Sequence, residues 1–128
     1  MLHLLDTSVC VSIIRGRSEL KNLPRTDHCI VSVITAAELE VGIHRSLRPA
    51  AQRLAVTGFL QLFDVLPFEV SAVGHYGEIR AELEKLGNSI GPLDLLIAAH
   101  ARSLGASVVT GNVGEFRRVP GLKVTAWK

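Results

Sequence analysis

Short apolar runs alternate along the chain with longer segments in which apolar residues recur every three or four positions. A short apolar or β-branched run between polar segments indicates a buried strand, and the longer period indicates a helix. The predicted strands are residues 1–5, 29–33, a short piece within LFDVLP (62–67), 106–110 and 122–127. The predicted helices are residues 7–14, 35–47, a segment from Pro49 that carries Leu54, Leu60 and Leu62, 69–86 and 92–104.

Glycine and proline mark several of the helix boundaries. Gly87 and Gly105 are placed to end two helices, and Pro92 suits the first turn of another. The charged stretch at residues 15–27 is predicted as a loop or a short helix. Because strands and helices alternate throughout, the pattern predicts a parallel sheet covered on both faces, which is an α/β sandwich. With neither a repeat nor a linker, residues 1–128 are expected to form a single domain.

The composition fits a globular domain with an aliphatic core. Of the 128 residues, 48% are hydrophobic and 20% are charged, which argues against disorder, and only 5% are aromatic. The net charge of +2 permits a polyanionic partner without requiring one. No uncharged apolar run is long enough to span a membrane, and Asp6 interrupts the only candidate export signal. We therefore expect a cytoplasmic protein in which Cys10 and Cys29 are buried thiols.

Four polar residues stand at strand ends or helix starts, where functional groups gather in α/β folds. Asp6 follows the first strand and is equally suited to cap the helix that begins at residue 7. Glu38 could complete a capping box with Thr35, but it lies beside the apolar stripe of its helix. Gly42, one turn further on, would leave space around the Glu38 carboxylate.

Asp94 is the most informative of the acids, because its helical neighbours at i+3, i+4 and i+7 are all apolar. A carboxylate on an apolar face is costly to desolvate unless a cation satisfies it. Asn112 belongs to a Gly-Asn pair that is typical of a turn, although an amide oxygen can also ligate a metal. Carboxylates crowded into one pocket would take up protons unless a hard divalent cation such as Mg²⁺ removed the repulsion. This chemistry suggests metal-assisted phosphodiester hydrolysis.

The order and spacing of these residues resemble the PIN-domain family, and within it the VapC-type toxins of bacterial toxin–antitoxin pairs. The matching stretches, which cover nearly the whole chain, are LLDTSV, VITAAELEVGI, EIRAELEKLGNSIGPLDLLIAAHA, VVTGNVGEF and VPGLKVTAW. The resemblance implies a PIN-like three-layer α/β/α sandwich with a central parallel sheet. It also implies an endoribonuclease that uses Mg²⁺, with Mn²⁺ as a substitute.

The same resemblance implies roles for individual residues. Asp6, Glu38 and Asp94 become the catalytic acids and, together with Asn112, the metal ligands. Two positions depart from the usual pattern, since many family members carry Asp in place of Asn112 and Asn in place of Ser8. The implied supporting residues are Thr7, Ser8, Thr110 and Glu115. The implied RNA contacts, each of which is also compatible with a solvated surface charge, are Arg15, Arg17, Arg45, Arg80 and Arg102.

The implied reaction is an in-line attack of water on phosphorus that leaves 5′-phosphate and 3′-hydroxyl ends. RNA is the implied substrate, and the anticodon loop of initiator tRNA is one candidate, since cleavage there would inhibit translation. The implied partners are a VapB-type antitoxin, whose flexible tail covers the catalytic groove, and a second copy of the chain in a homodimer. The apolar helices near residues 7–14 and 50–62 are expected to line this groove.

Two other classes of function stay open from the residues alone. An aspartate-nucleophile phosphotransferase would explain Asp6, but this class needs a second Asp where Ser8 stands. A receiver would need a further acidic pair and a late lysine that the sequence does not supply. A non-enzymatic PIN-like module that binds RNA or protein would explain Asn112, but it would not explain three intact acids. Cleavage of RNA, and its loss in acid-to-amide variants, would separate these classes.

Overall fold

The structure is a computed structural model that describes residues 1–25 and 28–127. Within these ranges the strands are β1 (His3–Leu5), β2 (Cys29–Ser32), β3 (Asp64–Leu66), β4 (Ser107–Thr110) and β5 (Lys123–Ala126). The helices are α1 (Thr7–Ile14), α2 (Val33–Arg45), α3 (Pro49–Leu60), α4 (Ser71–Lys85), α5 (Pro92–Leu104) and α6 (Val113–Phe116), with a 3-10 turn η1 at Leu20–Asn22. Thr26 and Asp27, at the end of the predicted charged loop, lie outside the described residues.

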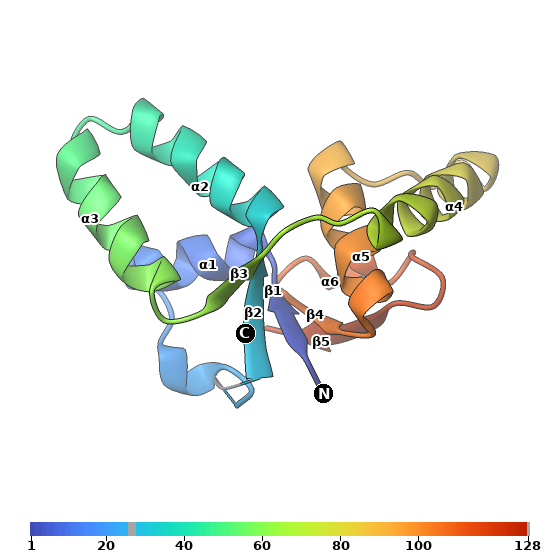
Figure 1. Ribbon diagram of the computed structural model, residues 1–128, viewed down its shortest axis with the longest axis horizontal. Coiled ribbons are helices and arrows are strands. Elements are labelled where there is room, and N and C mark those ends of the chain that lie inside the picture. Colours follow the sequence, from blue (N-terminus) through green and yellow to red (C-terminus); the bar gives the residue numbers. More distant parts are fainter. Residues whose placement is uncertain (26–27, 128) are drawn as a thin grey trace.

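The strands pair in parallel in the order β3-β2-β1-β4-β5 (Figure 1). Successive side chains of a strand point to opposite faces of the sheet. Residues side by side on neighbouring strands therefore form rows, and adjacent rows pack into the hydrophobic cores on opposite faces. The central rows are Leu4, Ile30 and Val108 toward one face and Leu5, Val31 and Val109 toward the other. Burial on both faces explains why these strands read as continuous apolar runs in the sequence.

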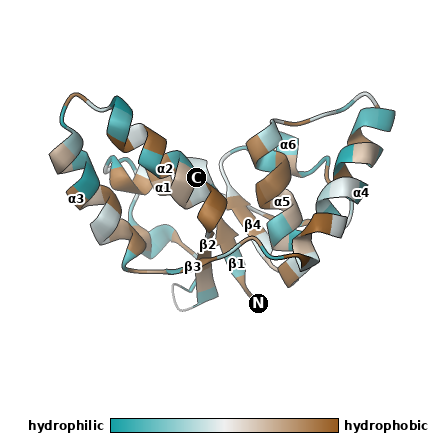
Figure 2. Cartoon of the chain, turned by 45° about the horizontal axis from the view of Figure 1, so that its top comes forward, coloured by the Kyte–Doolittle hydropathy of each residue, from teal (hydrophilic) through white to brown (hydrophobic). Residues whose placement is uncertain are grey.

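Helices cover each face of the sheet. One row of strand residues packs against α4 and α5 through Ile79 and Ile97, and the other packs against α1 and α3 through Val9 and Phe59. Figure 1 shows α1, α2 and α3 on one side of the sheet and α4, α5 and α6 on the other. Figure 2 shows hydrophobic strands between helices whose surfaces alternate between hydrophilic and hydrophobic patches. The predicted three-layer α/β/α sandwich with a central parallel sheet is therefore confirmed.

The differences from the predicted elements lie at helix ends and helix faces. α2 begins at Val33, two residues before the predicted start at Thr35, and β2 is correspondingly shorter. In and after α3, Leu54 and Leu62 are exposed, whereas Val56 and Phe59 are buried. The predicted ends at Gly87 and Gly105 are confirmed, since both glycines take a positive φ that residues with a side chain rarely adopt.

Two general expectations can also be compared with the structure. Cys10 and Cys29 are both buried thiols, as predicted. Among the helices of the described residues, none combines the length and the apolar character that a membrane crossing requires.

Candidate active site

The candidate site lies where the carboxyl ends of the central strands meet. β1 lies between β2 and β4, so the sheet order reverses beside its carboxyl end. Ligand sites in open α/β sheets form at such a switch point. Asp6 directly follows β1, Thr110 ends β4, and Ser32 ends β2 and begins α2.

Asp6 is a buried carboxylate held by neighbours from two elements. Its Oδ1 accepts hydrogen bonds from the Val9 backbone N–H (2.9 Å) and the Ser8 hydroxyl (2.7 Å). Its Oδ2 accepts a hydrogen bond from the Thr110 hydroxyl (2.5 Å). Burial raises the pKa of Asp6, and the hydrogen bonds from Thr110 and Ser8 oppose this rise. Asp6 is the N-cap of α1, and capping therefore does not exclude a second role for this side chain.

Glu38 is oriented from α1 rather than by a cap of its own helix. The capping box that was the alternative explanation for Glu38 does not form, because Ser32 and not Thr35 caps α2, by accepting from the Ile34 backbone N–H (3.0 Å). The Thr7 hydroxyl instead donates to Glu38 Oε1 (2.6 Å). The buried Thr35 hydroxyl lies 3.1 Å from that of Thr7. Since the single Thr7 proton points to Glu38, Thr35 must be the donor to Thr7, and two hydroxyls in series fix this carboxylate.

Asp94 lies in the first turn of α5 and is only half buried, yet it accepts no hydrogen bond from a described residue. Burial, together with the negative charges of Glu115, Asp6 and Glu38, raises the pKa of Asp94 to about 6. Asp94 therefore lies close enough to each of the other three carboxylates for their charges to act on it. Within the described ranges, none of them forms a salt bridge with a lysine, arginine or histidine.

Asn112 and Glu115 form the fourth corner of the site together. The Asn112 side-chain amide donates to Glu115 Oε2, and the Gly91 backbone N–H donates to Glu115 Oε1 (3.0 Å). These two hydrogen bonds, with that from Gly91 the larger influence, lower the pKa of Glu115 and favour its charged form. Sequence reasoning placed the ligand at Asn112 and gave Glu115 a supporting role. In the structure the Asn112 side-chain nitrogen is directed toward Glu115, and the negative charge of Glu115 raises the pKa of Asp94.

Oxygen donors dominate this site, and such donors suit a hard divalent cation. A half-buried carboxylate beside three like charges fits the same chemistry, because a cation would remove the repulsion that raises the pKa of Asp94. Among the described residues, no three acidic, histidine or cysteine side chains already lie close enough together to hold a metal. Side-chain rotation is therefore needed for shared coordination, and Asp94 can rotate without breaking a hydrogen bond.

Two of the predicted RNA-contacting arginines lie near the acids. Arg15 and Arg45 line a groove of about 380 Å³ between α1, α2 and α3, and Glu38 forms part of its wall. The predicted groove between residues 7–14 and 50–62 corresponds to this hollow, although α2 supplies much of its lining. Arg17 is exposed just beyond the end of α1.

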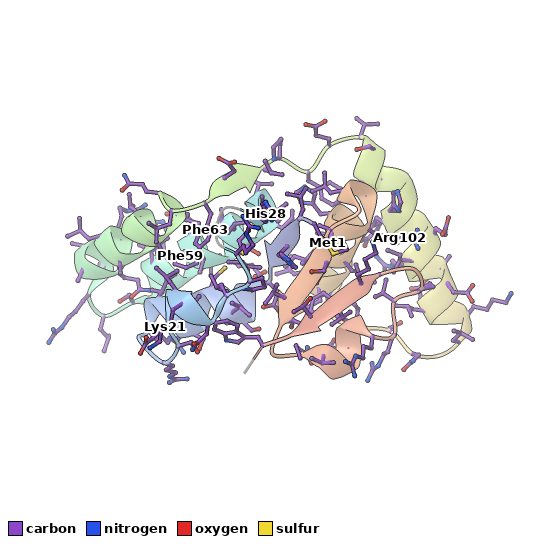
Figure 3. The ribbon with its side chains drawn as sticks, turned by 90° about the horizontal axis from the view of Figure 1, so that it is seen from below. Met1, Lys21, His28, Phe59, Phe63 and Arg102 are labelled. Carbon is purple, nitrogen blue, oxygen red and sulfur yellow. The ribbon has the colours of Figure 1, made fainter. Side chains whose placement is uncertain are left out.

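The other two arginines are engaged in contacts outside this groove. Arg80 donates to Glu84 and to the Tyr76 hydroxyl along α4. Arg102 is mostly buried, and its guanidinium donates to His75, to Glu78 and to the Pro120 carbonyl. Figure 3 shows Arg102 beside α4, whereas Phe59 and Phe63 lie on the opposite side of the molecule. Neither arginine lines the groove that contains Glu38.

Comparison with known proteins identifies the family of the chain. The family model described as PIN domain matches residues 3–122. The chain belongs to the PIN-domain family. This PIN domain is 41% identical to the tRNA(fMet)-specific endonuclease VapC of Salmonella typhimurium, across 97% of the chain and 96% of the relative. It is 35% identical to Ribonuclease VapC2 of Rickettsia felis, across 99% of the chain and 98% of the relative.

Comparison with solved structures also relates this PIN domain to VapC proteins. The crystal structure of DNA-bound VapBC from Salmonella typhimurium matches with a TM-score of 0.94 and 39% identity, and all of both chains is covered. The resemblance to VapC-type PIN domains that the sequence motifs indicated is therefore confirmed.

Proposed function

We propose that this PIN domain is a VapC-type toxin that acts as an endoribonuclease on the phosphodiester bonds of RNA. One observation carries the proposal: at the carboxyl edge of the sheet, the charges of Asp6, Glu38 and Glu115 all act on Asp94 and raise its pKa. The likeness to a VapC endonuclease over nearly the whole chain supports the same reaction class.

In this proposal Asp6, Glu38, Asp94 and Glu115 would hold Mg²⁺, or Mn²⁺ in its place. When bound, the cation would offset the negative charge of the phosphodiester and favour deprotonation of water. Asn112, which the sequence motif suggested as a ligand, would also orient Glu115, because its side-chain amide donates to that carboxylate. The site therefore keeps four carboxylates even though the residue at position 112 is neutral.

The protein's own residues would set the geometry of the attack. Ser8 and Thr110 fix Asp6, and Thr7 fixes Glu38. Asp94 is not fixed in this way, so it can adjust as the substrate phosphate enters. In-line attack by water would leave 5′-phosphate and 3′-hydroxyl ends on the RNA.

RNA would reach the acids along the groove that Arg15 and Arg45 line. Phosphate contacts from arginine position a strand without reading its sequence, and these two side chains share the groove with Glu38. Arg17 would extend the same basic surface. Arg80 and Arg102, which lie outside the groove, would not contribute to it. The 41% identity to a tRNA(fMet)-specific endonuclease makes initiator tRNA the first substrate to test.

We also propose a VapB-type antitoxin as the partner, because the matching Salmonella typhimurium structure is a VapBC complex. The groove between α1, α2 and α3 would receive the antitoxin tail, and the toxin would act as a homodimer within the assembly. We propose a cytoplasmic location as well, because the proposed tRNA substrate is found there.

The test is cleavage of initiator tRNA by the purified protein with Mg²⁺, Mn²⁺ or a chelator. We expect chelation to abolish cleavage and Asp6→Asn and Asp94→Asn each to lower it on the order of a hundredfold or more. Glu40→Gln is the matched control, since Glu40 lies on α2 but is exposed and pairs with Arg53. Binding of RNA without cleavage by any metal-loaded form would favour the non-enzymatic module, and equal activity in all variants would reject the acid site.

A further inference from the structure

A buried hydrogen bond joins the helices that carry two of the acids. His100 of α5 is 2% exposed, and its Nδ1 lies 2.8 Å from the hydroxyl of Ser32, which is fully buried. Ser32 is also the N-cap of α2, where its oxygen accepts from the Ile34 backbone N–H. The bond therefore joins the body of α5 to the N-cap residue of α2.

The neighbours of this pair favour Ser32 as the donor. The Ser32 hydroxyl has one proton and already accepts from the Ile34 backbone N–H, so it can donate to Nδ1 and still cap α2. The Pro67 backbone can only accept, because proline has no N–H, and it acts on the pKa of His100 as an acceptor does, which favours the ring proton on the second nitrogen. Burial lowers the pKa of His100, which agrees with a neutral ring.

The position of this bond means that a change in the angle between α2 and α5 would move the acids that the two helices carry. Glu38 lies six residues after Ser32 on α2, and Asp94 lies six residues before His100 on α5. With a rise of 1.5 Å per residue, each acid is about 9 Å along its helix from the bond. A 10° change in the angle between the helices would then shift the two acids relative to each other by about 1.5 Å. Displacements of about 1 Å are enough to damage catalysis.

The ring of His100 is also fixed from its other side. Phe68 packs edge-on against it, with ring centroids 5.5 Å apart. Pro67 and Phe68 belong to the segment that leaves β3, which Figure 1 shows crossing between the two helical layers toward α4. His100 therefore connects β2, α2, α5 and this crossing segment at a single buried point.

We propose that His100 is a positioning residue that fixes, through Ser32, the separation of Glu38 and Asp94 and thereby sets the affinity of the acid site for a divalent cation. The inference rests on the proposed function, since it takes the acids to be the cation site. His100 acts through the geometry of two helices and not by contact with the RNA.

The experiment measures Mn²⁺ binding directly, by calorimetry or electron paramagnetic resonance, together with thermal unfolding of the metal-free protein. His100→Leu keeps an apolar side chain in the space but removes the hydrogen bond. His100→Asn keeps a polar group near the position of Nδ1. Ser32→Gly removes the hydroxyl yet leaves a residue that is tolerated at an N-cap. We expect His100→Leu and Ser32→Gly to weaken Mn²⁺ binding about tenfold and His100→Asn to recover most of the affinity.

A second histidine–serine pair, which is partly buried, supplies the control. His3 Nδ1 lies 2.7 Å from the Ser107 hydroxyl, at the opposite ends of β1 and β4 from the acids. Ser107→Ala should lower the unfolding temperature but leave Mn²⁺ affinity unchanged. If His100→Leu behaves like Ser107→Ala, the positioning role is overturned while the nuclease proposal stands. If the wild type binds no Mn²⁺, or Asp94→Asn binds it equally well, the acid site and the positioning role both fail.

Discussion

The acids of the site differ in how firmly they are held. Asp6 accepts hydrogen bonds from the backbone of Val9 and from two hydroxyls, and Glu38 accepts one from Thr7. Asp94 has no such donor among the described residues, and its pKa of about 6 records burial and the repulsion of its neighbours. The unfavourable charge interactions of the site are therefore concentrated at Asp94, as expected of a residue kept for function rather than for stability.

The first prediction concerns the charge repulsion between Asp94 and its neighbouring carboxylates. Asp94→Asn should raise the unfolding temperature of the metal-free protein at pH 7.5 by about 3–5 °C, which corresponds to about 1 kcal/mol in a chain of this size. The same substitution should abolish cleavage, because it removes a proposed ligand. Calorimetry without divalent ions measures the first effect. A lower unfolding temperature in the variant would show that Asp94 is not under repulsion.

The second prediction separates Asn112 from Glu115. Glu115→Gln should lower kcat/KM for RNA by about tenfold to a hundredfold, because it removes the proposed fourth carboxylate. Asn112→Ala should have a smaller effect, since the Gly91 backbone N–H still holds Glu115. Steady-state cleavage at fixed Mg²⁺ measures both. If Asn112→Ala proved as damaging as Glu115→Gln, Asn112 would have to be a ligand itself.

Among the elements, α2 contributes most to the groove, and one of its glycines makes this testable. A Cβ on Gly42 would meet no atom within 4 Å, and Gly42 lines the groove beside Glu38 and Arg45. A larger side chain would therefore enter the groove without disturbing the core. Glycine is also a poor residue for the interior of a helix, by roughly 0.5–1 kcal/mol relative to alanine.

The third prediction follows from this open position. Gly42→Leu should preserve or slightly raise stability, while weakening both RNA cleavage and binding of the antitoxin tail at least tenfold. Gly74→Leu is the control, because Gly74 lies in α4, has the same open surroundings and does not line the groove. Equal losses in the two variants, or no loss in Gly42→Leu, would contradict a role for this groove.

The sequence predicted the order of these elements better than their ends. Buried parallel strands give apolar runs, and Gly87 and Gly105 end helices for reasons local to the backbone. The start of α2 was missed because β-branched residues, interrupted only by Ser32, continue from Ile30 to Thr35 across the boundary from strand to helix. Only the position of the Ser32 side chain shows which residue caps the helix. The single turn of α6 is likewise too short to produce a periodic pattern.

For the molecule as a whole, the raised pKa values of Asp94 and Asp6 couple folding to pH. A carboxyl group whose pKa is higher in the folded state than its ordinary value of 3.8 holds its proton longer when folded than when unfolded. For Asp94, stability is therefore present at low pH and is lost as the pH rises from about 4 through about 6. A bound divalent cation would reverse this loss.

The fourth prediction uses that coupling. Without divalent ions, the unfolding temperature of the wild type should fall more, or rise less, between pH 4.5 and pH 7 than that of Asp94→Asn. Added Mg²⁺ should raise the wild-type value more at pH 7 than at pH 5, because binding competes with protons at low pH. Thermal scans across this range measure both effects. Parallel pH curves for the two proteins would contradict the raised pKa of Asp94.

Much of the site could be foreseen because it depends on topology. Asp6 had to lie at the carboxyl edge of a parallel sheet, and Glu38 and Asp94 lie on helices beside that edge. The direction of each side chain could not be foreseen, because it depends on packing between distant segments. The hydrogen bond from Asn112 to Glu115 and that from Thr7 to Glu38 are of this kind.

The bond between Thr110 and Asp6 joins residues 104 positions apart in the chain. A ribosome that adds about 5–20 residues per second needs roughly 5–20 s to travel from one to the other. During that interval Asp6 has been made but β4, which fixes it, does not yet exist. Asp94 and Glu115 also enter the growing chain late. The proposed nuclease site therefore cannot be complete until nearly all of the chain has been synthesised, and the proposed antitoxin has this time to accumulate.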